Sequence, residues 1–194
     1  MPIGPSDDVR YGWPGAGGEG LSLAANRIAR ALARSGAKVI GLLPVDDRLG
    51  PPERLAPALL RLAEALSGFV ADEVGIVDAW PTWPWGDAFA YGDAAAARIR
   101  PVGDRVLEIA PPPCGDAPAA SIALANTLAG RPKGIDRVLV SLGGFAPPGV
   151  VPPAAEWVDG IVLMVAAHRS RQRVVQDLGQ RMAAGKALGA VLLG

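Results

Sequence analysis

The most informative segment of the sequence is glycine-rich and reads Gly15-Ala16-Gly17-Gly18-Glu19-Gly20-Leu21-Ser22. It separates a short candidate strand, residues 8–13, from a segment with helical periodicity, residues 21–35. Glycines at such a junction let backbone N–H groups curl around a phosphate, and the start of the helix adds positive potential. A tight turn followed by a helix cap produces the same pattern. Residues 15–22 alone therefore leave a phosphate loop and a structural turn as equal alternatives.

Helical and strand patterns alternate along the rest of the chain. Helices are expected over residues 21–35, 53–67, 118–128 and 170–184, and strands over residues 38–43, 73–79, 105–110, 137–142, 161–167 and 188–193. This alternation predicts right-handed β-α-β crossovers. The strands are apolar without in-out alternation, which is typical of a sheet buried on both faces. We expect one α/β domain over residues 1–194, with three layers, a mainly parallel sheet and helices on both of its faces.

The first expected helix has two distinct faces. Its apolar residues recur at helical spacing from Leu21 to Leu32. Three arginines, Arg27, Arg30 and Arg34, share another face, which we expect to be solvated.

Composition narrows the classes of function. The 194 residues carry 19 Lys and Arg against 19 Asp and Glu, so the formal net charge is zero. Neutrality argues against bulk attraction to nucleic acid or anionic lipid, and we expect no nucleic-acid partner. The single cysteine, Cys114, excludes a disulfide within the chain and is typical of a reducing cytoplasm. No apolar run reaches the roughly 18–20 residues of a membrane span, and no signal peptide is recognisable.

Isolated reactive residues do not assemble a recognisable catalytic or metal site. His168 is the only histidine and has no cysteine near it in the sequence, so we expect no metal site. Cys114 has no neighbouring histidine that would activate it as a nucleophile.

A second unusual segment carries three tryptophans, Trp80, Trp83 and Trp85, in the run AWPTWPWG over residues 79–86. Its prolines favour an extended backbone. Two interpretations are open. The tryptophans close one end of the sheet over the core, or they form an exposed partner surface, since Trp is enriched at binding hot spots.

The glycine-rich stretch matches most of the Walker A pattern, G-x-x-x-x-G-K-[ST]. Gly15, Gly20 and Ser22 fall in register, but Leu21 holds the lysine position. The lysine of this motif supplies a point charge to the β- and γ-phosphates, and leucine supplies none. Losing the charge should cost several kcal/mol of transition-state stabilisation, as for other lost oxyanion-stabilising donors.

The segment over residues 17–40 resembles the start of P-loop ATPases of the ParA/MinD type. It is most similar to the cytoplasmic tyrosine-kinase domains of bacterial exopolysaccharide assembly. Later segments resemble the same family in the same order: residues 105–110, 135–142 (the Walker B strand), 157–165 and 188–193. The resemblance covers most of the chain and implies a P-loop NTPase-like fold.

The residues that hydrolyse ATP in this family are missing from the matching positions. Leu21 replaces the Walker A lysine, Ala16 the extra signature lysine of the loop, and Ser141 the Walker B aspartate. Only Asp46 is retained from the D-x-D pair that ends the Walker A′ strand. The tyrosine cluster that the kinases autophosphorylate is also missing. The resemblance therefore implies a vestigial phosphate loop, residues 15–22, and a vestigial magnesium side, Asp46 and Ser141.

The resemblance and these losses together imply a non-catalytic pseudo-ATPase or pseudo-kinase. We expect a regulator or scaffold of exopolysaccharide synthesis or export that needs no cofactor. Its partner is expected to be a membrane-embedded or cytoplasmic protein of the polysaccharide assembly system, which would recruit this cytoplasmic chain to the inner membrane. The resembled families form dimers or rings, so a homo-oligomer is also expected.

Three alternatives remain open. A nucleotide-binding switch would hold ATP or ADP with Mg weakly through loop amides, Ser22 and an arginine. An active kinase or ATPase would need a lysine from outside the loop, and Lys38, Lys133 and Lys186 are poor candidates. A ParA/MinD-like positioning protein usually carries a membrane-targeting tail, and the sequence ends at Gly194 without one.

Overall fold

A computed structural model describes residues 12–13, 18–46, 49, 52–78, 98–112, 117–147, 149–166, 172–182 and 185–193. Its helices are α1 (Gly18–Arg34), α2 (Pro52–Ser67), α3 (Ala117–Ala129) and α4 (Gln172–Arg181), with the 3-10 helix η1 (Pro153–Trp157). Its strands are β1 (Gly12–Trp13), β2 (Val39–Pro44), β3 (Glu73–Val77), β4 (Arg98–Gly103), β5 (Val106–Ala110), β6 (Ile135–Ser141), β7 (Gly160–Ala166) and β8 (Ala187–Leu193).

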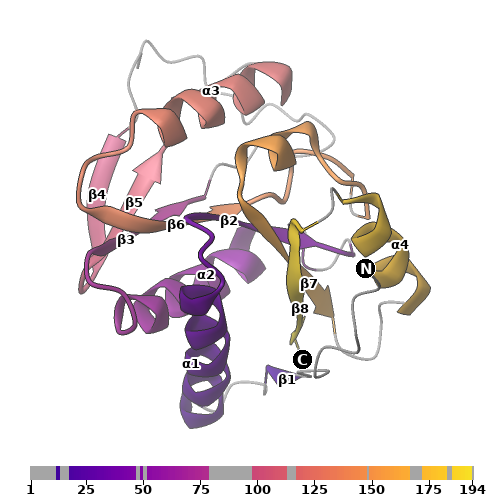
Figure 1. Cartoon of the computed structure of the whole chain (residues 1–194), viewed down its shortest axis with the longest axis horizontal. Coiled ribbons are helices and arrows are strands. Elements are labelled where there is room, and N and C mark those ends of the chain that lie inside the picture. Colours follow the sequence, from indigo (N-terminus) through magenta and orange to yellow (C-terminus); the bar gives the residue numbers. More distant parts are fainter. Residues whose placement is uncertain are drawn as a thin grey trace.

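The eight strands form one sheet in the order β1-β8-β7-β2-β6-β3-β5-β4 (Figure 1). All neighbouring strands are parallel except β4 and β5. β2 lies between β6 and β7, where Leu42 is paired with Ser141 on one side and with Val162 on the other. At one edge, the two residues of β1 pair with Leu192 and Leu193 of β8. The expected, mainly parallel sheet is confirmed.

Helices α1 and α2 cover one face of the sheet (Figure 1). The residues that α2 buries include the whole predicted inward set: Leu55, Leu59, Leu62 and Leu66. They form one hydrophobic cluster with residues of α1 such as Ile28 and Leu32 and with residues of the strands. Burying one leucine fully stabilises a fold by about 1.5–3 kcal/mol, so this cluster holds α2 on the sheet.

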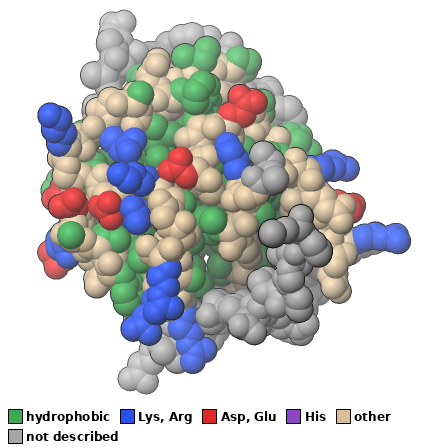
Figure 2. Space-filling view, viewed as in Figure 1, with side chains coloured by type: hydrophobic (Ala, Val, Ile, Leu, Met, Phe, Trp, Pro, Cys, Tyr) green, Lys and Arg blue, Asp and Glu red, His purple; other side chains and the backbone are tan. Residues whose placement is uncertain are grey.

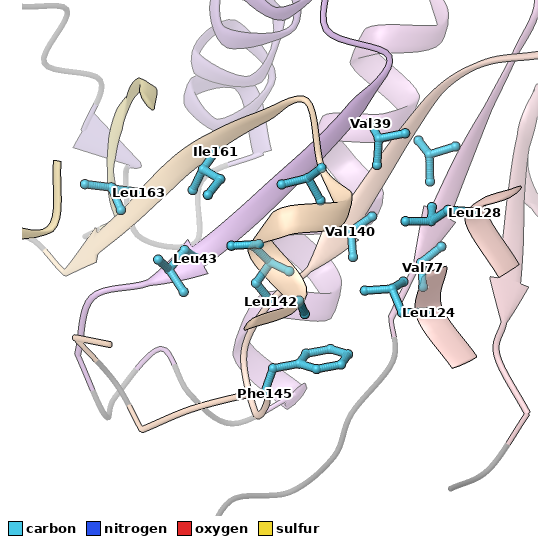
Figure 3. Packing of buried hydrophobic residues seen from close by; sticks show 14 of the residues in the cluster. Val39, Leu43, Val77, Leu124, Leu128, Val140, Leu142, Phe145, Ile161 and Leu163 are labelled. Atoms are coloured by element: carbon cyan, nitrogen blue, oxygen red, sulfur yellow. The ribbon is translucent and has the colours of Figure 1, made fainter. Parts of the chain in front are cut away.

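Helices α3, η1 and α4 cover the opposite face. Figure 3 shows Leu124 and Leu128 of α3 in the cluster that also contains Val77 of β3 and Val140 of β6. The three-layer architecture with helices on both faces is therefore confirmed. None of the helices described above combines the length and the apolar character that crossing a membrane requires.

The edge strand β4 was not among the expected strands. Its sequence, RIRPVG, contains two arginines and a proline, which are rare in central strands but tolerated at an exposed edge. Arg100 of β4 forms an ion pair with Glu108 of β5 at 2.6 Å. Pairing with β5, rather than a local pattern, makes residues 98–103 a strand.

A carboxylate fixes the amino end of β2. Asp159 Oδ2 accepts hydrogen bonds from the backbone N–H groups of Lys38 and Val39, at 2.9 and 2.8 Å. The Asp159 N–H donates to the Val39 carbonyl at 2.8 Å. These bonds join the loop before β7 to the start of the central strand, and so set how β2 and β7 are aligned.

The substitution Asp159→Ala is expected to lower the free energy of unfolding by about 1–3 kcal/mol, because two N–H groups lose their acceptor. Denaturant titration measures this change. The matched control is Asp72→Ala, whose exposed side chain makes no interaction with the described residues and should change stability by less than about 0.5 kcal/mol. Equal effects of the two substitutions would contradict the role assigned to Asp159.

Candidate functional site

The carboxyl ends of β2, β3, β6 and β7 meet at one edge of the sheet, because these strands are parallel. In open α/β sheets, ligands bind in the crevice outside this edge. Ser141 is the last residue of β6, and Asp46 follows the end of β2 by two residues. The structure therefore brings the two residues of the predicted magnesium side to the same edge. Asp78, which directly follows β3, joins them there and was missed by the sequence patterns.

Asp46 is half-buried, and its carboxylate contacts the backbone of the neighbouring strand. Its Oδ2 accepts a hydrogen bond from the Ala166 N–H at 3.2 Å. Just before it, the Val45 N–H donates to the Met164 carbonyl at 2.9 Å, which extends the pairing of β2 and β7. The Asp46 carbonyl accepts from the Leu49 N–H at 3.2 Å. The Asp46 carboxylate thus acts as an acceptor for the end of β7.

Ser141 is sealed inside the protein. It is 1% exposed, and its Oγ has no hydrogen-bond partner among the described residues. Its register partner is Leu42, which belongs to the hydrophobic cluster beneath α1 and α2. A carboxylate at this position would be costly to bury without a cation. Within the described ranges, no group of three or more His, Cys, Asp or Glu side chains could hold a metal ion.

The order of strands separates Ser141 from the glycine-rich stretch. Residues 15–17 lie outside the described residues, and residues 18–22 begin α1, directly after the edge strand β1. Three strands lie between β1 and β6. At about 4.8 Å per strand, roughly 19 Å separate the ends of β1 and β6, too far for both to hold one magnesium–phosphate group. The vestigial phosphate loop at residues 15–22 stays a prediction, and the strand that precedes it, β1, is separated from Ser141 by three strands.

A second strand–helix junction lies next to Ser141. It is the connection between β2 and α2, residues 45–51. Strand β2, which leads into this connection, is the direct neighbour of β6. Helix α2 begins at Pro52, preceded by Pro51 and followed by Glu53. Prolines have no backbone N–H to donate, and an acidic residue in the first turn repels an anion. The start of α2 is therefore unfavourable for phosphate, while residues 47, 48, 50 and 51 of the junction lie outside the described residues.

The remaining predicted residues lie outside the described part of the chain. They are Trp80, Trp83 and Trp85, together with Cys114 and His168. The two interpretations of the tryptophan segment both stay open.

No protein-family profile and no curated protein matches the chain. Solved structures of kinase domains do share its fold. The tyrosine kinase domain of BceF superimposes with a TM-score of 0.55 and 18% sequence identity, over 90% of this chain and 75% of that one. The kinase domain of VpsO gives a TM-score of 0.55 and 16% identity, over 89% of this chain and 95% of that one. At the level of the fold, the predicted resemblance to tyrosine-kinase domains is therefore confirmed.

The substitution Ser141→Ala is expected to raise the free energy of unfolding by about 1 kcal/mol, because it removes a buried hydroxyl that has no described partner. Ser67→Ala is the matched control. Ser67 is also buried, but its Oγ donates to the Glu64 carbonyl at 2.8 Å, so its removal should not stabilise the protein. Thermal and denaturant unfolding measure both changes. A loss of stability in Ser141→Ala would mean that the hydroxyl is bonded after all.

Proposed function

We propose that this chain is a non-catalytic relative of the kinase domains whose fold it shares. It acts as a regulator or scaffold in exopolysaccharide synthesis or export, through contact with another protein. The exopolysaccharide setting follows from the resemblance of residues 17–40 and of the later strands. The partner is a membrane-embedded or cytoplasmic protein of the polysaccharide assembly system, and it recruits the chain to the inner membrane.

The position of the lysines carries the non-catalytic part of this proposal. The chain has three, Lys38, Lys133 and Lys186, and each precedes the start of one of the parallel strands β2, β6 and β8. All three therefore lie at the amino edge of the sheet. Strands of six or seven residues, at about 3.3 Å per residue, place that edge roughly 20 Å from the carboxyl edge. Lys186 is also engaged, since its Nζ donates to the carbonyls of Ala155 and Glu156.

Phosphoryl transfer depends on charge at the carboxyl edge. The transferring group needs positive charge and magnesium around its oxygens, and the protein contributes little else to the reaction. None of the three lysines can reach this edge, and Ser141 supplies no carboxylate for magnesium. The prolines and Glu53 at the start of α2 further disfavour a phosphate there. These features support a protein that keeps the fold without the reaction.

A nucleotide-binding switch is the second candidate, and the start of α1 favours it. The first four N–H groups of a helix have no partner within the helix, and α1 begins with Gly18-Glu19-Gly20. Together with the glycines before them, these amides could hold ATP or ADP with Mg weakly and without turnover.

Calorimetry with ATP and ADP, in the presence of magnesium, tests both candidates. The wild type is expected to show no binding tighter than about 1 mM. Two variants restore a lysine: Leu21→Lys in the glycine-rich stretch, and the double variant Pro51→Lys with Pro52→Ser, which places Lys and Ser directly after Gly50. Because the junction of β2 and α2 lies beside β6, only the double variant is expected to gain affinity, by at least about tenfold.

The outcomes separate the hypotheses. Micromolar binding by the wild type would move the nucleotide switch to first place. A gain in Leu21→Lys alone would return the phosphate loop to residues 15–22. Measurable ATP turnover by the wild type would overturn the non-catalytic proposal.

A further inference from the structure

Helix α1 presents three arginines on its outer face. Arg27, Arg30 and Arg34 are exposed, and none of them forms an ion pair with a described residue. Figure 2 shows blue side chains gathered at the lower part of this view, where α1 lies in Figure 1. At 1.5 Å per residue, the three charges span about 10 Å along the helix. In a chain of zero net charge, this is a local concentration of positive charge.

An exposed aromatic ring adjoins these arginines and is held in place. The Arg30 guanidinium lies over the Phe69 ring, 5.7 Å from its centroid, and Phe69 is 39% exposed. Phe69 belongs to the loop after α2. Arg105 binds this loop, because its guanidinium donates to four carbonyls between Ser67 and Asp72. Phe69 therefore presents a fixed surface, and its stacking orders Arg30 before any partner binds.

The three arginines and Phe69 together are called the α1 arginine face. Arginine and aromatic residues are enriched where proteins bind one another. A guanidinium pairs with a carboxylate, and equally with a phosphate, through two parallel hydrogen bonds, so the arginines by themselves indicate an anionic ligand. Two exposed acidic residues, Asp72 and Glu73, follow Phe69 in the sequence, but neither forms an ion pair with a described arginine.

A protein segment fits this face better than a membrane does. Helices that lie in a membrane interface insert a free apolar face into the lipid. Between residues 25 and 34, the apolar face of α1 is already occupied by the core, where Ala25, Ile28, Ala29 and Leu32 are buried. Over residues 25–34, the part of α1 whose side chains the structure describes, the outer face offers arginine, asparagine and alanine, and the exposed ring of Phe69 adjoins it.

We propose that the α1 arginine face is a docking surface for an acidic segment of a partner protein. The carboxylates of that segment pair with Arg27, Arg30 and Arg34, and an apolar residue beside them contacts Phe69. The proposal deepens the proposed function by naming the chemistry of the partner, but it does not depend on whether the chain binds nucleotide.

Binding to a synthetic helical peptide with Glu at every third and fourth position tests the proposal. The control peptide carries Gln in place of each Glu. The variant reverses all three charges, as Arg27→Glu, Arg30→Glu and Arg34→Glu. Its matched control is Arg173→Glu with Arg181→Glu, two exposed arginines on α4. The wild type and the α4 variant should bind the Glu peptide equally, and the triple variant should bind at least about tenfold more weakly at low salt.

Three results would overturn the proposal. The first is that the wild type fails to bind the Glu peptide. The second is that the wild type binds the Gln peptide as tightly as the Glu peptide. The third is that the α4 variant loses as much affinity as the triple variant. Vesicles of phosphatidylserine and phosphatidylcholine are measured in parallel. Binding to vesicles without binding to the Glu peptide would assign the face to a membrane instead. Because the readout is peptide affinity, its failure leaves the nucleotide calorimetry unaffected, and the two proposals fail separately.

Discussion

β2 is hydrogen-bonded to β6 on one side and to β7 on the other, and the positions of Asp46 and Ser141 at the candidate site follow from these two ladders. The pairing of Leu42 with Ser141 fixes how far β6 extends beyond β2. The Val45–Met164 hydrogen bond then carries Asp46 to the end of β7. The packing leaves little freedom, since a Cβ on Gly41 would lie 2.5 Å from Leu142 Cδ1. A change of register in either ladder would therefore displace the residues at the carboxyl edge of the sheet.

The architecture could be predicted from the sequence because helix and strand periodicities are local. Apolar spacing gave the helices and most strands, and the alternation of the two gave a parallel sheet. The order of strands could not be obtained in this way, because pairing joins distant segments. The glycine-rich motif directed attention to residues 15–22, but β1 lies at the edge of the sheet. The junction at residues 45–51 has no glycine-rich motif, and it was marked only by Asp46, by the apolar strand before it and by the helix after it.

For the individual site residues too, local sequence patterns predict some properties, and long-range packing determines the others. Asp46 and Ser141 could be placed at one edge from the sequence, since both lie at the carboxyl ends of strands that were expected to be parallel. The burial of Ser141 could not be predicted, because it depends on the tertiary packing around the end of β6. The burial of Ser141 also connects the missing Walker A lysine with the missing Walker B aspartate. Where no lysine or magnesium supplies positive charge, an aspartate sealed at this position would be an uncompensated buried charge. A neutral serine removes that cost while the apolar layers, which hold the fold, stay unchanged.

The contact of Arg105 with the end of α2 has a consequence for the order of folding. Arg105 lies in the turn of the β4–β5 hairpin, with a left-handed φ of 56°, and it binds carbonyls 33 to 38 residues earlier in the chain. The helix can form locally, but the carbonyls after it gain their shared donor only once the hairpin has closed. The last turn of α2 and the hairpin should therefore open and close as one cooperative unit in native-state hydrogen exchange. A surface loop that looks independent is in this way tied to the stability of the far edge of the sheet.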